Sequence, residues 1–403
     1  MRIALVCGHF LPELGYIEVH LAKAFTRLGH DLKVFTSTAV PPYVRKRIEN
    51  DYPAGTDYVN DIQVCRLNPS FTLGQMVRCK GLREAVGQFG PELIVVIGLG
   101  KLFPIPVLSD VERKCSLAVL LGDNVDNKKL YSASSGRAFV KQTSSSITQH
   151  LLKNRAYRLA VQGADKLFAY TPETAEVVAS FIPRGLLPEM EKKMQFISLG
   201  FDEDRYYFSR QERTAKRREL GLTEGELLFV TATRVTANKR LEMVIRSIPH
   251  LPNAKYALIG FMGDSYEAHL RNLIAELKMG KQVLCFPFLP PEKVREMYNA
   301  ADIGIWHHPT ASTLEGMGTG LPVLLEKRKK VAHLLHCPGS GSFFKEGEVL
   351  AAMRKTCSAH QHATTVRMQL AAAHAKRFSW QAIAGQILSA MAQHDTPLNT
   401  SGR

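Results

Sequence analysis

Short apolar runs alternate with helix-like stretches along most of the chain, and this alternation constrains the fold most. In the first half, runs typical of strands lie at residues 3–7, 31–36, 62–67, 93–97, 116–121 and 166–170. Helical patterns accompany them at residues 15–29, 72–88, 103–112, 143–162 and 173–182. Strands that alternate with helices indicate a parallel sheet with helices on both faces. We therefore predict an α/β fold.

The second half repeats this pattern with clearer boundaries. Strand-like runs lie at residues 227–233, 256–260, 283–288, 303–307 and 322–325, with helical patterns at 239–249, 265–278, 290–300 and 313–319. The 403 residues suffice for two or three domains. We predict two doubly wound parallel-sheet domains that face a central cleft, residues 1–205 and 206–377, joined near the charged stretch SRQERTAKRREL.

The last part of the chain, residues 378–403, predicts one more helix and a frayed tail. Ser379 has the side chain of an N-cap, and an apolar stripe follows it on one helical face. This stripe needs a partner. Two arrangements stay open: the helix packs on its own domain, or it crosses back to the first domain.

The chain is basic, with 52 Lys and Arg against 37 Asp and Glu and a net charge of +15. The excess is spread over both halves, whereas a nucleic-acid arm would concentrate it, and no short nucleic-acid signature occurs. An anionic membrane surface or an anionic glycan fits better. Lys153, Arg155 and Arg158 in the helical pattern at 143–162 motivate the membrane hypothesis, because each cation near anionic lipid contributes roughly 1 kcal/mol.

Cysteines, histidines and apolar segments point to a cytoplasmic protein without a metal site. The seven cysteines show no CxxC spacing, and the fourteen histidines show no HExxH pattern. No apolar run approaches the ~18 residues of a membrane span. The chain also starts directly in a strand-like run, without a signal peptide. We expect reduced, mostly buried thiols and no metal.

Ligands bind at the carboxyl ends of strands in open parallel sheets, so four segments attract attention. Gly15 opens a helix, where free N–H groups favour a phosphate, although turns also need glycine for backbone reasons. Arg234 ends a strand, and Lys239 starts a helix; they suit a diphosphate or simply a solvated surface. Glu315, at a helix N-terminus, can accept hydrogen bonds from a ribose diol or act as a cap. Gly260 allows a close ligand approach or a plain turn.

Together these segments resemble the retaining, nucleotide-sugar-dependent glycosyltransferases of the GT-B fold, the "glycosyl transferases group 1". The family's first loop corresponds to Gly15-Tyr16-Ile17-Glu18, and its Arg and Lys correspond to Arg234 and Lys239. Its most specific motif corresponds to the run from Glu315 to Val323, EGMGTGLPV. Two further segments match the family more weakly: Gly200-Phe201-Asp202 and Phe378-Ser379-Trp380.

The resemblance implies transfer of a sugar from a nucleotide-diphosphate sugar with retention of anomeric configuration. Arg234 and Lys239 would hold the leaving diphosphate in place of a metal, so neither a metal nor a further cofactor is expected. Asp123 would assist as a polar group near the donor sugar. The remaining donor-binding residues would be Gly15, Tyr16, Gly260, His307, Glu315 and Thr319.

Three residues depart from the family pattern. His307 stands eight positions before Glu315, where the family has a second Glu that helps to bind the donor sugar. An imidazole cannot accept two hydrogen bonds as a carboxylate does, so the donor sugar or its binding should differ. Gly122-Asp123-Asn124 replaces a His, with Asp123 or Asn124 as the substitute. Tyr16 replaces a glycine and would cover a sugar face.

We therefore predict a glycosyltransferase that acts on a glycan or lipid-linked acceptor, held mainly by the first domain. It would work in the cytoplasm, with peripheral attachment to the inner membrane face. Two alternatives stay open: a non-catalytic GT-B protein that binds a nucleotide sugar, as a pseudoenzyme or assembly subunit, and a sugar-nucleotide epimerase. The epimerase would need additional acid or base residues, which the sequence does not identify.

Overall fold

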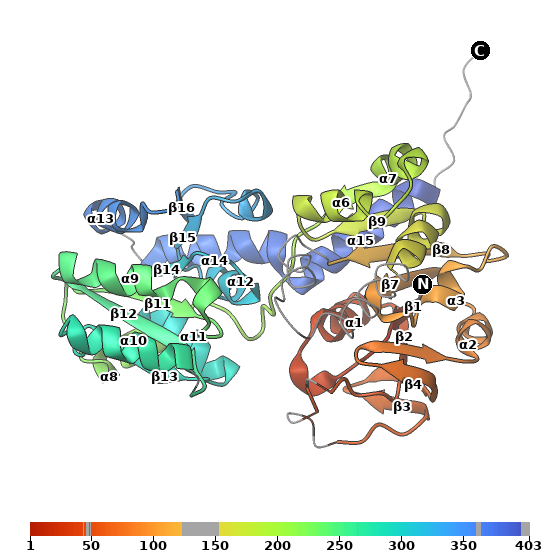
Figure 1. Cartoon of the computed structure of the whole chain (residues 1–403), viewed down its shortest axis with the longest axis horizontal. Helices are drawn as coiled ribbons and strands as arrows, with labels where there is room; N and C mark the ends of the chain where they lie inside the picture. Colours follow the sequence, from red (N-terminus) through yellow and green to blue (C-terminus); the bar gives the residue numbers. More distant parts are fainter. Residues whose placement is uncertain are drawn as a thin grey trace, which may run out of the picture. The chain divides into compact units, whose positions relative to one another are not determined.

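The computed structural model describes residues 1–42, 44–45, 48, 50–122, 153–263, 265–359 and 364–395. The chain divides into two compact units (Figure 1). Unit 1 consists of Met1–Ser198 and the chain from Ile383 onward, and unit 2 of Leu199–Ala382. Both units contain a parallel sheet with helices, so the predicted α/β class is confirmed.

Unit 1 is built on an eight-stranded sheet in the order β10-β9-β8-β7-β1-β2-β4-β3, parallel except for β3. Its strands are β1 (Arg2–Cys7), β2 (Asp31–Ser37), β3 (Gly55–Val59), β4 (Ile62–Leu67), β7 (Leu93–Ile97), β8 (Ser116–Leu121), β9 (Lys166–Ala169) and β10 (Met194–Phe196). The helices, with η for 3₁₀ helices, are η1 (Pro12–Leu14), α1 (Ile17–Arg27), α2 (Leu82–Phe89), η3 (Leu99–Lys101), α3 (Ile105–Leu108), α6 (Pro172–Ala179), η4 (Arg184–Leu186) and α7 (Leu187–Lys193).

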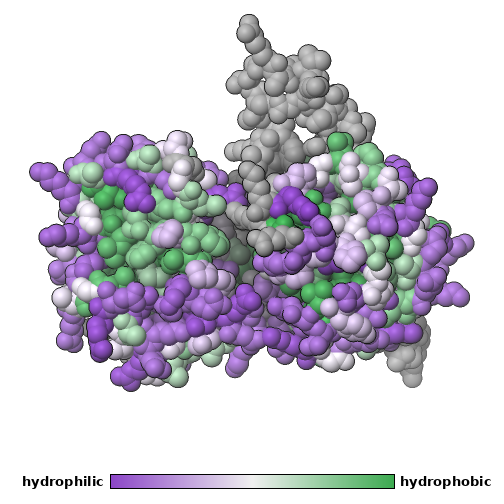
Figure 2. Space-filling view, turned by 90° about the horizontal axis from the view of Figure 1, so that it is seen from below, coloured by the Kyte–Doolittle hydropathy of each residue, from purple (hydrophilic) through white to green (hydrophobic). Residues whose placement is uncertain are grey.

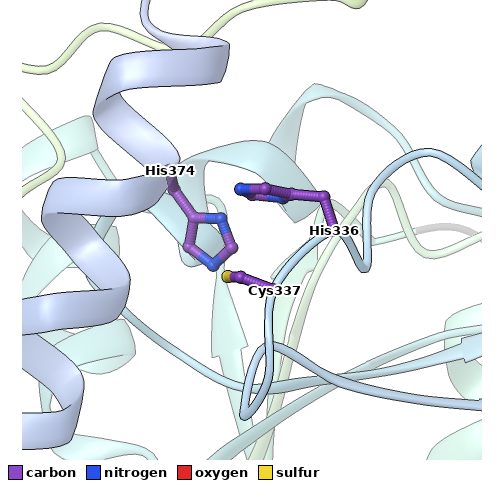
Figure 3. A group of neighbouring side chains, drawn as sticks. All are labelled: His336, Cys337 and His374. Carbon is purple, nitrogen blue, oxygen red and sulfur yellow. The ribbon is translucent and has the colours of Figure 1, made fainter.

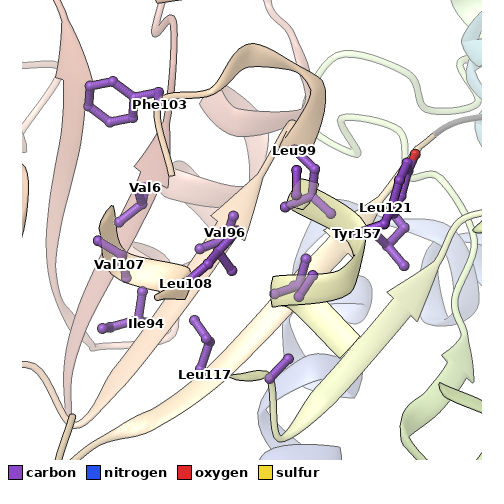
Figure 4. Packing of buried hydrophobic residues seen from close by; sticks show 14 of the residues in the cluster. Val6, Ile94, Val96, Leu99, Phe103, Val107, Leu108, Leu117, Leu121 and Tyr157 are labelled. Carbon is purple, nitrogen blue, oxygen red and sulfur yellow. The ribbon is translucent and has the colours of Figure 1, made fainter. Parts of the chain in front are cut away.

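The central strands of this sheet are buried on both faces, which is why they are apolar runs rather than alternating patterns. On one face, Val6, Val96 and Leu117 pack with Leu108 of α3 (Figure 4). Tyr157, from a helical segment at residues 153–163, completes this cluster. Removing this apolar surface from water provides the main stabilisation of the unit.

Two predicted helices of unit 1 are shorter than expected. In place of the helix predicted from residue 72, β5 (Pro69–Leu73) and β6 (Met76–Cys79) form an antiparallel hairpin, and α2 begins only at Leu82. Gly74, with φ of 59°, supplies the left-handed residue that the hairpin turn needs. The helix predicted at residues 103–112 is reduced to α3.

Unit 2 is built on a six-stranded, fully parallel sheet in the order β13-β12-β11-β14-β15-β16. Its strands are β11 (Leu227–Ala232), β12 (Ala254–Phe261), β13 (Val283–Pro287), β14 (Ile303–Trp306), β15 (Val323–Glu326) and β16 (Gly341–Phe344). The helices are α8 (Arg210–Glu219), η5 (Ala237–Lys239), α9 (Leu241–Ser247), η6 (Ile248–His250), α10 (Ser265–Glu276), α11 (Pro291–Ala300), α12 (Ala311–Gly318), η7 (Lys329–Val331), α13 (Val349–Ala359) and α14 (Thr364–Phe378).

The charged stretch that we expected between the domains is helix α8 of unit 2. Its arginines bind the buried carboxylate of Asp302, with Arg213 at 2.5 Å and Arg217 at 2.9 Å. Lys216 pairs with Glu296 of α11 at 3.1 Å. The charges are therefore used to attach α8 to unit 2, and they are not part of a solvated linker.

Two lesser sequence motifs meet where the chain enters and leaves unit 2. The Phe201 N–H donates to the Phe378 carbonyl at 2.9 Å, and the Trp380 N–H donates to the Phe201 carbonyl at 3.1 Å. A side chain on Gly200 would lie 2.6 Å from the Trp380 indole, so only glycine fits there. Helix α15 (Trp380–Asp395) starts at this point, and from Ile383 onward it belongs to unit 1.

Hydrophilic side chains cover much of the visible surface of both units, interrupted by apolar patches (Figure 2). Among the described residues, no helix combines the length and apolar character needed to cross a bilayer.

Candidate functional site

The strand order of unit 2 places its switch point between β11 and β14. The chain runs from β11 to β12 and β13 on one side of the sheet, and returns to β14, β15 and β16 on the other. A crevice opens at the carboxyl ends of strands where the order reverses in this way. Arg234 follows β11 and His307 follows β14, so the topology brings these two predicted site residues to this crevice.

Arg234 and Lys239 lie on the segment between β11 and α9. Arg234 is exposed and lies two residues beyond the end of β11, rather than at the strand end as expected. Lys239 is half-buried and ends η5, whereas α9 begins only at Leu241. Arg240 between them has φ of 52°, and this left-handed residue separates the two helices. Both cations can therefore act from a loop beside the strand end.

The N-terminus of α12 is fixed to the same strand end. The Ser312 hydroxyl donates to the Ala232 carbonyl, the last residue of β11, at 2.7 Å. The Thr313 hydroxyl accepts from the Thr310 N–H at 3.2 Å. The positive end of the α12 dipole therefore lies beside the loop that carries Arg234, and both favour an anion.

Glu315 lies in the second turn of α12, not at the helix N-terminus as expected, because the helix begins earlier, at Ala311. Tyr206 donates a hydrogen bond to its carboxylate. Burial raises the pKa of Glu315 to about 7, although this hydrogen bond opposes the shift; nearby Asp202 adds to it. The carboxyl therefore releases its proton at a clearly higher pH than an exposed glutamate does.

His307 is buried with 1% of its side chain exposed, and it contacts a carboxylate from the neighbouring strand. Its Nδ1 lies 2.9 Å from Oε2 of Glu326, at the end of β15. Burial lowers the pKa of His307, which favours the neutral ring, with Nδ1–H donating to Glu326. The Nε2 atom has no hydrogen-bond partner in the described structure and is left as an acceptor.

Two arginines that the sequence reasoning missed surround Glu326. Arg328 donates to its Oε1 at 2.7 Å, and Arg240 lies 3.8 Å from its Oε2. Burial opposes the charge of Glu326, but the contacts with His307 and Arg328 outweigh it and lower the pKa of this carboxyl. The sequence reasoning also missed Glu326. Its position at the end of a strand could have identified it, because the same criterion identified Arg234. Position 307 thus has a histidine where the family pattern has a carboxylate, but Glu326 on the adjacent strand places a carboxylate next to this histidine.

Gly260 and Thr319 have structural explanations. Gly260, with φ of 121°, lies at an irregular step of β12, and a side chain would approach the Thr233 carbonyl to 2.0 Å. Thr319 is fully buried at the C-terminal end of α12, and its hydroxyl donates to the Gly316 carbonyl at 2.7 Å. Both residues shape the elements around the crevice.

Two of the three site residues predicted in unit 1, Gly15 and Tyr16, lie in the segment after β1. Gly15 ends η1 with φ of 57°, and Tyr16, 38% exposed, precedes α1. Glu18, on the first turn of α1, is buried, and its charge acts with burial to raise the pKa of Tyr170. Asp123 and its neighbour Asn124 lie outside the described residues.

Comparisons with known proteins agree with this geometry. The family model "Glycosyl transferases group 1" matches residues 212–356. An uncharacterized glycosyltransferase of Methanocaldococcus jannaschii is 22% identical over 341 residues, 81% of this chain and 80% of that protein. The crystal structure of Anabaena HepE in complex with UDP has a TM-score of 0.69 at 18% identity, covering 98% of this chain and all of HepE.

A third likeness is WaaG, a glycosyltransferase involved in lipopolysaccharide biosynthesis. It has a TM-score of 0.61 at 16% identity, over 96% of this chain and 99% of WaaG. The fold is GT-B, as the sequence motifs predicted, and the family match covers most of unit 2, including Arg234, Lys239 and Glu315. Together, the comparisons show the GT-B fold for the whole chain and a likeness to the glycosyl transferases group 1 over most of unit 2.

Proposed function

We propose that this protein transfers a sugar from a nucleotide-diphosphate sugar to a glycan or lipid-linked acceptor. The observation that carries the proposal is the arrangement at the carboxyl edge of unit 2. Two cations follow β11, the N-terminus of α12 is fixed beside them, and Glu315 lies one turn further along that helix. HepE, which shares the fold, has been crystallised with both UDP and UDP-glucose.

In this proposal, Arg234 and Lys239 bind the diphosphate. Negative charge grows on the diphosphate as the bond to the sugar breaks, so fixed cations stabilise the transition state more than the bound donor. Glu315, in its ionised form, accepts hydrogen bonds from the ribose hydroxyls. The two cations remove the need for a metal at the leaving group.

The donor sugar is held differently from the family pattern. His307 Nε2 offers one acceptor in place of two carboxylate oxygens, and Glu326 holds the ring through Nδ1. We propose that this His–Glu pair replaces the usual carboxylate near the sugar. The acceptor would bind mainly to unit 1, where Tyr16 is exposed beside α1. The involvement of WaaG in lipopolysaccharide biosynthesis supports a lipid-linked acceptor.

Transfer would proceed with retention of configuration, by attack of the acceptor on the same face that the diphosphate leaves. The departing diphosphate would itself take up the acceptor's proton, and no covalent carboxylate intermediate is required. Proton NMR of the product formed from an α-linked donor checks this step, because an α-linked product indicates retention and a β-linked product contradicts it.

The test of the function combines a donor screen with two variants. A thermal-shift screen against nucleotide diphosphates and their sugars identifies the donor, because a ligand that binds the native state raises the melting temperature. With that donor, Arg234→Ala and Lys239→Ala should each lower turnover by at least ~10²-fold. Lys281→Ala, an exposed cation before β13, should leave turnover unchanged.

Near-normal turnover in both variants would contradict the proposed diphosphate site. Calorimetric binding of a nucleotide diphosphate, without transfer or release of sugar from any donor tested, would instead favour the non-catalytic alternative. Conversion of the donor into its epimer, without an acceptor, would favour the epimerase. The departures from the family pattern at His307, Asp123 and Tyr16 are the reason for testing these two alternative functions.

A further inference from the structure

Three potential metal ligands meet in unit 2, and none of them is among the residues of the candidate donor site. His336 and Cys337 lie on the segment between η7 and β16, and His374 lies on α14 (Figure 3). One ligand atom from each of them, the thiol sulfur and a nitrogen from each ring, lies within 4.8 Å of the other two. In Figure 3 the three side chains point toward one another.

The burial of His374 is the second observation. The residue is 0% exposed, and neither of its ring nitrogens has a hydrogen-bond partner in the described structure. Its ring packs against the rings of His336, at 5.1 Å, and Phe378, at 6.2 Å. A buried polar atom normally has a partner, since leaving it without one forfeits its hydration. A ligand on one ring nitrogen would explain a histidine at this position.

The side chains of His336 and Cys337 each have an atom available to bind a metal ion. Nδ1 of His336 lies 3.2 Å from the Leu334 carbonyl, a contact that leaves Nε2 available and fixes the tautomer in the way common to metal-binding histidines. Cys337 carries a free thiol. Its carbonyl accepts a hydrogen bond of 2.6 Å from the Ser340 hydroxyl, which orders the loop.

We propose that His336, Cys337 and His374 bind one Zn²⁺ ion, with water as the fourth ligand. A thiolate with two neutral imidazoles is a donor set that suits zinc. Bonds of roughly 2.0–2.3 Å at tetrahedral angles place ligand atoms about 3.3–3.7 Å apart, so the side chains need to close by only about 1 Å. Binding replaces the thiol proton, which is released to solvent, by the metal.

The metal would connect the loop before β16 to α14, and α14 supports the helix that carries Glu315. Arg367 of α14 is buried and donates to the carbonyls of Tyr298, Ala301 and Thr319, at 3.0, 2.7 and 3.1 Å. Thr319 follows the end of α12. We assign the ion a structural role, the stabilisation of unit 2, because none of its three ligands is a donor-site residue; the proposal is independent of the proposed function.

Cobalt substitution of the full-length protein tests the proposal directly. After metal removal, one equivalent of Co²⁺ should give a sulfur-to-cobalt charge-transfer band and the intense visible bands of tetrahedral cobalt. Zn²⁺ should then bleach them. Elemental analysis of protein purified without chelator should find about one zinc per chain. A chelator should lower the melting temperature, and added zinc should restore it.

Matched variants locate the ligands. Cys337→Ser should abolish the charge-transfer band, and His374→Gln should reduce zinc to well below one per chain. Cys357→Ser and His250→Gln, which change a thiol and an imidazole elsewhere, should keep both signals. The wild-type chelation and cobalt titration need no substitution, so they decide the question even if a variant fails to fold. Absence of the thiolate band in the wild type, or its persistence in Cys337→Ser, would overturn the proposal.

Discussion

Glu315 is a carboxylate whose surroundings oppose its charge. Its ordinary pKa of 4.5 is raised to about 7 by burial, even though Tyr206 donates a hydrogen bond to it. A binding site tolerates this cost when the charge is needed for a ligand. In the proposed function, the hydroxyls of a ribose would supply the hydrogen bonds that burial removes. The residue therefore links the stability of unit 2 to pH.

Replacing Glu315 by Gln should stabilise the protein at alkaline pH. Between pH 4.5 and about 7 the folded state keeps a proton that the unfolded chain has released, so the free energy of unfolding falls as pH rises through this window. Glu315→Gln removes this loss. We expect it to be more stable than the wild type by about 1–3 kcal/mol at pH 8, and nearly equal to it below pH 4.5.

Urea unfolding of both proteins across this pH range measures the effect. Glu219→Gln, an exposed carboxylate on α8, is the control and should show a difference that barely changes with pH. A Glu315→Gln difference that is equally independent of pH would mean that the pKa of Glu315 is not raised.

At the scale of elements, buried charge attaches helices to the unit 2 sheet. Asp302 precedes β14 with 2% of its side chain exposed, and it binds Arg213, Arg217 and the Leu228 N–H. The fully buried Arg367 of α14 lies near the same group, and burial lowers its pKa to about 9. The acidic partner therefore compensates several cations that would otherwise repel one another.

Asp302→Ala should destabilise the protein by about 3–5 kcal/mol, because it leaves partly buried arginines without their counter-charge. Glu219→Ala, which removes an exposed partner of Lys216, should cost less than about 1 kcal/mol. Denaturant unfolding at neutral pH compares the two. Similar values for both variants would show that burial does not set the strength of these pairs.

Glycines in two elements should respond in opposite directions. Gly260→Ala in β12 places a side chain 2.0 Å from the Thr233 carbonyl at φ of 121°, and should cost at least about 2 kcal/mol. Gly87→Ala in α2 meets nothing within 4 Å and should stabilise by about 0.5–1 kcal/mol. Thermal unfolding of the two variants decides this, and a stable Gly260→Ala protein would contradict the close approach.

For the whole molecule, the net charge of +15 now divides into parts with different uses. Arg213, Lys216 and Arg217 are paired inside unit 2. The proposed function assigns Arg234 and Lys239 to the diphosphate. In unit 1, Arg155 and Arg158 are exposed, whereas Lys153 is half-buried, with its Nζ 5.8 Å from the centre of the Phe181 ring. Only part of the basic excess is therefore available to a membrane surface.

If unit 1 meets an anionic membrane, the double variant Arg155→Gln/Arg158→Gln should bind anionic vesicles roughly 30-fold more weakly than the wild type, at about 1 kcal/mol per cation. Co-sedimentation with vesicles that contain phosphatidylserine measures this. Arg246→Gln/Lys281→Gln in unit 2, both exposed, is the control. If the binding of the wild type to vesicles does not change with salt concentration or with the content of anionic lipid, the membrane hypothesis is wrong.

The sequence by itself predicted the features that depend on neighbours along the chain. Strands such as β7 and β8 begin and end where the apolar runs predicted, because a strand buried on both faces needs apolar residues throughout. The spacing of Arg234, Lys239 and Glu315 carried the resemblance to the GT-B glycosyltransferases. The hairpin at β5 and β6 was missed, because Gly74 makes a turn inside an apparently helical pattern.

The tertiary structure decided what depends on partners distant in sequence. The pairing of His307 with Glu326, the contact of Tyr206 with Glu315, and the meeting of His374 with Cys337 each join residues from different elements. No local pattern marks such pairs, since strand order and helix packing bring them together. Burial, which exists only in the folded chain, then raises the pKa of Glu315 and leaves the nitrogens of His374 without a hydrogen-bond partner among the described residues.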